Sequence, residues 1–190
     1  MNNKNHYLKL TLVVLLVLPI LFGINRRYLF IIQITPFIIL MAIFGVLLLI
    51  GLGKLIITYG FNQKSMEIMK KHEVIKAFTQ KNFRVIFLWF PITILMEELI
   101  FRYYITGFLA SVFDLLRAIS LAGLIFGFYH IHIWFFSENK KITLIFILFS
   151  LILGIVLNFI LYYLGILFCI TMHYFLVTWI YYKLYKRYLQ

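Results

Sequence analysis

Long apolar runs alternate with short polar stretches along this chain. The runs are Leu8–Ile24, Tyr28–Ile50, Asn82–Ile105, Ala118–Phe136, Ile142–Tyr162 and Gly165–Tyr182. Each is close to the roughly 20 residues that an α-helix needs to cross a bilayer. The pattern predicts an all-α fold, a polytopic membrane bundle of about six transmembrane helices. The length fits one integral membrane domain over residues 1–190.

The composition agrees with a lipid environment. Hydrophobic residues make up 64% of the chain and charged residues 13%, whereas a soluble domain is about half apolar and one quarter charged. The formal charge of +12 could indicate a nucleic-acid partner, but Lys and Arg cluster between the apolar runs, which is typical of a protein oriented in a bilayer. We therefore expect the lipid bilayer and no nucleic acid as a partner. The single cysteine, Cys169, excludes a disulfide framework and is expected in the core.

The basic residues also predict an orientation. With six spans, both termini share one side of the membrane with the second and fourth loops, and Arg26, Arg27 and Arg117 lie on the other. Positive charge concentrates on the cytoplasmic side, so we expect an integral protein of the plasma membrane with both termini cytoplasmic. The more basic side carries Lys4, Lys9, Lys54, Lys64, Lys70, Lys71, Lys76, Lys81, Arg84, Lys140, Lys141, Lys183, Lys186 and Arg187.

Three local features refine this picture. Lys4 and Lys9 precede the first run, as in a signal peptide, but no small-residue cleavage site follows, so we expect a retained helix. Pro36 and Pro91 lie inside expected spans, where proline is predicted to kink a helix. The basic segment 61–82 fits two interpretations equally well, a helix on the inner membrane surface or a solvated loop, and its role stays open.

Three ionisable residues interrupt the third run. Charges inside a span cost roughly 2.5–3.5 kcal/mol each on insertion scales, so they usually face the bundle interior and have partners. Glu98 and Arg102 are four residues apart and can pair on one helix face. Glu97 lies about 100° around the helix without such a partner, which suits a general acid or base. The alternative is a charge cluster that only locks helices together.

Histidines occur in two other spans. His130 follows Phe126 by one helical turn, and His173 lies in the last run. His132 lies about 200° around the helix from His130, so at most one of the two is expected to face a given site. At about 1.5 Å per residue, Glu97, His130 and His173 lie roughly 12, 18 and 12 Å below the outer ends of their spans. The three side chains are therefore expected to converge near the membrane midplane.

Three motifs in this order resemble those of a known family. "EELIFR" matches E-E-x-x-x-R, "FGFYH" matches F-x-x-x-H, and "GIVLNFILYYLGILFCITMH" matches a last region that ends in a histidine. Together they are similar to the CPBP family, the CAAX prenyl protease and bacteriocin-processing (Abi) intramembrane metalloproteases. The resemblance covers about Pro91 to Thr178, within a motif-bearing core of about 82–182.

The resemblance implies a helical membrane core around a water-filled cavity. In it, Glu97 and His130 activate water, and His173 stabilises the tetrahedral oxyanion. Glu98, Arg102 and Phe126 have supporting roles as the other motif residues. No HExxH motif is present. The residue types allow a divalent metal such as zinc, held by Glu97, His130 and His173 with an open water position, and they equally allow a metal-free carboxylate and imidazole mechanism.

One position departs from the family pattern. The last motif is commonly H-x-x-x-N, but here Val177 stands where the asparagine is expected. Valine cannot donate a hydrogen bond, and losing one oxyanion donor typically costs about 10²–10³ in rate. Thr178 and Asn158 are candidate substitutes. Asn158 is equally well explained as an interhelical bridge beside a close-packing glycine, Gly154.

Two functions follow from these observations. The first is an intramembrane endopeptidase of the CAAX-protease or Abi type, which hydrolyses a peptide bond of a membrane-associated peptide or protein. The alternative is a catalytically weak or inactive relative that acts as a bacteriocin self-immunity or regulatory membrane protein. The motif residues favour the first and Val177 favours the second. A transporter is a weaker third reading. The sequence identifies neither the substrate, prenylated or not, nor the oligomeric state.

Overall fold

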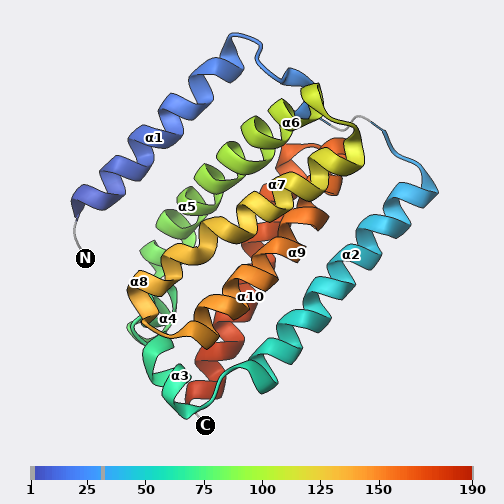
Figure 1. Ribbon diagram of the computed structural model, residues 1–190. Coiled ribbons are helices and arrows are strands. Elements are labelled where there is room, and N and C mark those ends of the chain that lie inside the picture. The colour runs from blue at the N-terminus through green and yellow to red at the C-terminus, as the bar shows by residue number, and fades with distance from the viewer. Residues whose placement is uncertain (1–2, 31–32, 190) are drawn as a thin grey trace.

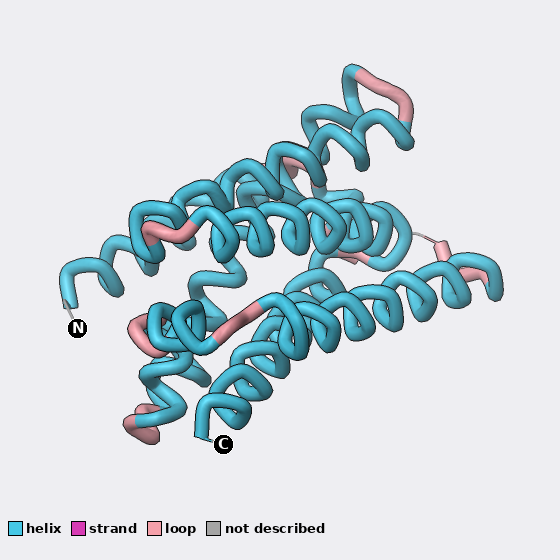
Figure 2. Tube along the Cα trace, turned by 60° about the horizontal axis from the view of Figure 1, so that its bottom comes forward, coloured by secondary structure: helices cyan, strands magenta, loops and turns pink. Residues whose placement is uncertain are grey.

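A computed structural model describes residues 3–30 and 33–189. This part of the chain is helical and contains no strand (Figures 1 and 2). Helices α1 and α2 lie at opposite edges of the bundle, with α5, α7, α9 and α10 between them. The α-helices are α1 (Asn3–Leu21), α2 (Pro36–Leu55), α3 (Gln63–Met69), α4 (Glu73–Thr79), α5 (Phe90–Glu97), α6 (Gly107–Val112), α7 (Leu115–Tyr129), α8 (Ile133–Ser137), α9 (Lys140–Leu164) and α10 (Ile166–Leu189).

Within the described residues, four helical stretches are long and apolar enough to cross a membrane: Pro36–Gly60, Leu115–Ser137, Lys140–Leu164 and Ile166–Arg187. The all-helical membrane fold is thus confirmed, but the count of about six spans is not. The first expected run forms an apolar helix over His6–Leu21, shorter than a typical span. The third lies in a continuous helix over residues 83–112. Its apolar sequence is interrupted by Glu97, Glu98 and Arg102, the three motif charges.

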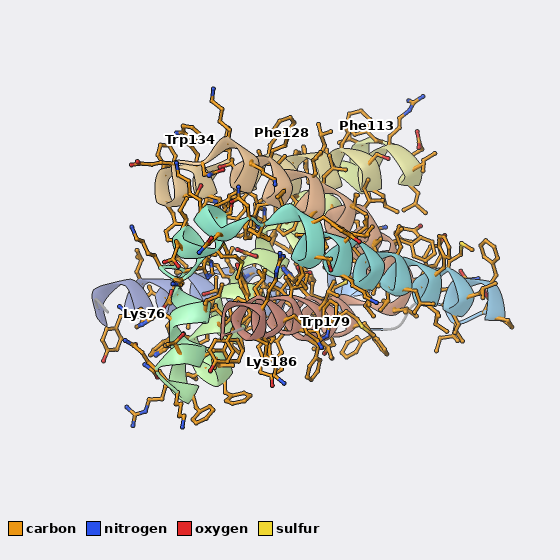
Figure 3. All side chains as sticks on the ribbon, turned by 90° about the horizontal axis from the view of Figure 1, so that it is seen from below. Lys76, Phe113, Phe128, Trp134, Trp179 and Lys186 are labelled. Atoms are coloured by element: carbon orange, nitrogen blue, oxygen red, sulfur yellow. The ribbon has the colours of Figure 1, made fainter. Side chains whose placement is uncertain are left out.

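The outer surface fits a lipid environment. Large apolar side chains project outward from several helices and from the turn between α6 and α7, among them Phe113, Phe128 and Trp134 (Figure 3). Cys169 is buried in the core, as expected, and its Sγ donates to the carbonyl of Leu157. The protein therefore presents many large apolar side chains outward and buries several polar groups, among them Glu98 and Arg102, as a membrane bundle does.

Pro36 does not kink a helix, because it begins one. The expected span from Tyr28 starts instead at Pro36, and residues 31 and 32 of that span lie outside the described residues. Thr35 caps the helix by accepting the backbone N–H of Ile38 at 3.2 Å. Proline is favoured at the first helical position because its missing N–H would have no intrahelical partner there.

Two π-helical segments widen the helix that carries the motif charges. The first, Val85–Trp89, ends two residues before Pro91, whose ring in a regular α-helix clashes with the carbonyl four residues earlier. The second, Glu98–Thr106, begins directly after Glu97. Such segments are rare and often mark functional sites.

Close packing of small residues joins α7 to α9. The Cα of Gly123 lies 2.9 Å from where a Cβ on Gly154 would be, so any larger residue at position 154 would force the two helices apart. One turn further along α9, Asn158 accepts the Thr106 hydroxyl at 2.8 Å and donates to the Ile119 carbonyl at 3.3 Å. These contacts hold the first half of α7 against α9.

The basic segment 61–82 forms α3 and α4. Met66 and Met69 of α3 and Val74 and Ile75 of α4 are buried, and they pack in one cluster with Tyr181 of α10. The apolar residues of this segment thus face the bundle, and the solvated-loop interpretation is wrong.

We predict that acid weakens the docking of α4. His72 caps α4 by accepting the Val74 N–H at 3.3 Å, and its Nε2 lies 3.0 Å from the Tyr181 hydroxyl. Burial, with smaller effects of His132 and Lys9, lowers the pKa of His72 from 6.5 to about 4. Between these values the unfolded chain binds a proton that the folded protein does not, so stability falls as the pH drops from about 6.5 to about 4.

The measurement is the thermal unfolding midpoint in detergent across this pH range. His72→Asn is the matched control, because asparagine keeps a good helix cap and does not titrate. The wild type should lose more stability than His72→Asn on acidification. Parallel profiles would contradict the prediction.

Candidate functional site

A cavity of about 280 Å³ lies inside the bundle, and Glu97, His130 and His173 all line it. They come from three different parts of the fold: the end of α5, the turn after α7, and α10. Most of the remaining wall is apolar and is supplied by side chains of α5, α9 and α10, such as Ile94, Phe149, Leu153 and Ile180. The structure therefore brings together the three residues that the motifs single out.

Glu97 and Glu98 face different surroundings although they are neighbours. Glu97 is 8% exposed and lines the cavity. Glu98 is fully buried, and its Oε2 lies 3.4 Å from the Nε of Arg102. The predicted Glu98–Arg102 pair is thus confirmed, and Glu97 has no such cation beside it in the helix.

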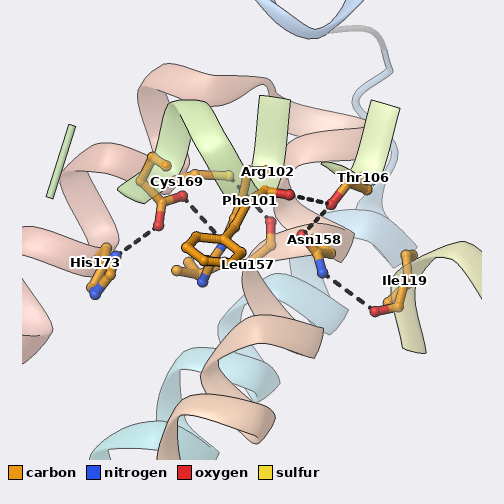
Figure 4. A network of polar contacts seen from close by, with 9 residues as sticks. Phe101, Arg102, Thr106, Ile119, Leu157, Asn158, Cys169 and His173 are labelled. Carbon is orange, nitrogen blue, oxygen red and sulfur yellow. Dashed lines mark hydrogen bonds and ion pairs between the residues drawn. The ribbon is translucent and has the colours of Figure 1, made fainter. Parts of the chain in front are cut away.

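The second oxygen of Glu98 binds a partner that the sequence did not predict. Nδ1 of His173 donates to Oε1 of Glu98 at 2.7 Å (Figure 4). His173 is 2% exposed. The two residues are 75 positions apart, and no spacing rule relates helices that distant in the chain. The contact leaves Nε2 of His173 as the nitrogen that is free to act in the cavity.

Phe126 lies at the centre of this network. It is fully buried, and the guanidinium of Arg102 lies 3.7 Å from its ring centroid. The ring also meets His130 and His173 edge-on, at centroid distances of 4.8 and 5.9 Å. Phe126 therefore packs against Arg102 of the buried ion pair and against both imidazole rings.

His130 and His132 both line the cavity, so the expectation that at most one could face it is wrong. The segment His130–His132 is a 3₁₀ turn. At three residues per turn, positions two apart are about 120° apart, compared with about 160° in an α-helix. The two rings lie 5.6 Å apart. His132 also lies within electrostatic reach of Glu97.

Asn158 and Thr178, the two candidate substitutes for the missing asparagine, do not line the cavity. Asn158 is 1% exposed and bridges α9 to its neighbours, and the described lining includes neither Asn158 nor Thr178. Val177 does line the cavity, one turn from His173 on α10. The position where the family pattern has an amide thus faces the same space as the motif residues.

The donor arrangement does not fit a metal. No group of three or more His, Cys, Asp or Glu side chains in residues 3–30 and 33–189 is close enough together to hold a metal ion. Glu97, His130 and His173 share a cavity wall but not a coordination sphere. We therefore derive no step through a metal.

The comparisons with known proteins agree with the motifs. No curated protein and no solved structure matches the chain. A model of the family described as type II CAAX prenyl endopeptidase Rce1-like matches residues 79–179, and the CPBP resemblance is thereby confirmed. Since this match spans more than half of the 190 residues and includes the whole motif region, the chain belongs to the Rce1-like family of type II CAAX prenyl endopeptidases.

Proposed function

We propose that this protein is an intramembrane endopeptidase that hydrolyses a peptide bond of a membrane-associated peptide or protein. The observation that carries the proposal is the meeting of Glu97, His130 and His173 in one cavity with mostly apolar walls. Such a cavity admits a lipid-facing peptide, and its few polar groups are those that hydrolysis needs.

The hydrogen bonds support a different role for each imidazole. Nδ1 of His130 lies 2.9 Å from the carbonyl of Phe126. A carbonyl only accepts, so Nδ1 carries the proton, and Nε2 has a lone pair that can accept a proton from water. His130 thus suits a base that acts together with the Glu97 carboxylate.

His173 suits the opposite role. Its Nδ1 donates to Oε1 of Glu98, and in the imidazolium form the ring carries a second N–H at Nε2. That N–H can donate to an oxyanion that forms on the substrate carbonyl. Arg102, paired with Glu98, holds this carboxylate in place.

The reaction then follows in two steps. Water attacks the scissile carbonyl carbon while Glu97 and His130 take its proton, and the resulting oxyanion accepts a hydrogen bond from His173. The tetrahedral intermediate then collapses, the C–N bond breaks, and the leaving amine takes the proton back from the base. The carboxylic acid that forms gives its proton to the amine, so the products are a carboxylate and an ammonium group.

We predict that His130→Ala and His132→Ala differ sharply. Loss of the base should lower kcat by about 10²–10⁴-fold in His130→Ala, whereas His132→Ala should keep activity within a few fold, because His132 is exposed and the family motif does not include it. Initial cleavage rates of both purified variants give the comparison. If His132→Ala is the more damaged variant, the roles of the two histidines are exchanged.

We also propose an orientation with both termini cytoplasmic, supported by the excess of Lys and Arg on that side. The plasma membrane remains the proposed location. In this orientation, the helix over residues 83–112 begins on the cytoplasmic side, at the end that carries Arg84.

A second function remains a candidate because Val177 lines the cavity. Without the amide donor, the protein would be a weak or inactive relative that binds a peptide, for example in bacteriocin self-immunity or regulation. Binding without cleavage would distinguish this candidate from the enzyme.

The proposal is tested by cleavage in proteoliposomes. Purified protein is incubated with a farnesylated CAAX peptide and with a library of membrane-inserted peptides, and mass spectrometry identifies the cut bond. Glu97→Gln provides the blank. Cleavage by the wild type that is absent from the blank supports the enzyme, and equal signals in both support the binding protein.

A further inference from the structure

A cation lies on the cavity wall away from the motif residues. Lys9 of α1 is partly buried, and its Nζ donates to the Thr93 hydroxyl of α5 at 2.9 Å. Both residues line the same cavity as Glu97. Lys9 lies before residue 79, where the family match begins, so the motifs give it no role.

The ammonium of Lys9 lacks an anionic partner. None of the ion pairs formed by the described residues includes it. Glu73 also lines the cavity, but it is exposed at the start of α4. An ammonium has three N–H donors and Thr93 accepts one of them. A cation beside apolar walls without a counter-charge is unfavourable, so this point of the cavity favours an anion.

The helix register places this cation relative to the reacting bond. Thr93 and Glu97 are four residues apart in α5, on the same face, and are separated by about 6 Å along the axis. An extended peptide advances about 3.3 Å per residue. A substrate group at Lys9 therefore lies about two residues from the bond that Glu97 attacks.

We propose that Lys9, positioned by Thr93, binds a carboxylate of the peptide substrate about two residues from the scissile bond. The carboxylate is either the C-terminus of the substrate or an acidic side chain. This inference rests on the proposed endopeptidase function and adds a specificity determinant from α1. It also gives a role to the polar contact that joins α1 to the cavity wall.

Binding measurements test this without turnover. In the Glu97→Gln background, three fluorescent farnesylated CAAX peptides are compared: the free acid, its C-terminal amide, and an amide with glutamate two residues after the scissile bond. A charge-assisted hydrogen bond corresponds to about 10- to 100-fold in Kd. The free acid or the glutamate peptide should bind tighter than the plain amide by this factor, which also identifies the source of the carboxylate.

The lysine variants complete the test. Lys9→Met should remove the preference by weakening only the carboxylate peptides, and Lys9→Arg should retain most of it. Lys54→Met, at an exposed lysine outside the cavity, controls for the lost net charge. If no carboxylate peptide is preferred, or if Lys9→Met weakens all three peptides equally, the inference is wrong. Because binding is measured in an inactive background, that result would leave the peptidase proposal standing.

Discussion

Replacing Glu97 by glutamine is expected to leave a folded protein and to lower peptide turnover by about 10²–10⁴-fold, the usual contribution of a general base. Glutamine has the same shape as glutamate but cannot take the proton of water. Glu97 lines the cavity and forms no ion pair among the described residues, so no buried partner loses its counter-charge. Yield, thermal midpoint and initial cleavage rate should be measured on the same preparation.

Arg102→Ala provides the contrasting control for Glu97→Gln. Arg102 is fully buried between Glu98 and the ring of Phe126. Removing one member of a buried pair leaves the other charge uncompensated and costs about 3–5 kcal/mol. Folded yield should therefore fall in Arg102→Ala and stay normal in Glu97→Gln. Equal loss of yield in the two variants would indicate that all three motif charges are structural.

Val177→Asn is expected to raise turnover, by up to about 10²–10³-fold if the missing amide alone limits the reaction. Val177 lines the cavity, and His173 lies one turn away on the same face of α10. An asparagine there could donate to the oxyanion beside Nε2 of His173. The new amide is tolerated because it faces a cavity that holds polar groups rather than a dry helix interface.

Two variants control for the effect of cavity size and for background cleavage. Val177→Ala also enlarges the cavity but adds no donor, so it should not be faster than the wild type. Combining Val177→Asn with Glu97→Gln should abolish the gain. If Val177→Asn is no faster than Val177→Ala, the oxyanion donor lies elsewhere.

The sequence alone determined the features that depend on local spacing or on composition. Apolar runs of membrane length indicated a helical membrane protein, because a bilayer requires each span to satisfy its own backbone hydrogen bonds. The four-residue spacing of Glu98 and Arg102 predicted their pair, and the unpaired neighbour Glu97 was singled out on the same argument. The three motifs identified the family. Each of these follows from positions that are close in the chain or from the order of short motifs.

The tertiary structure alone decided which helices meet and how individual turns deviate from ideal geometry. It paired His173 with Glu98 across 75 positions, and it tightened the turn after α7 so that His132 joined His130 in the cavity. It also began α2 at Pro36 instead of kinking it there, and it placed Lys9 of the first helix beside Thr93. A helical repeat fixes only the face on which a side chain lies. The partner of that face depends on packing between distant helices and on local 3₁₀ and π turns, and neither follows from periodicity.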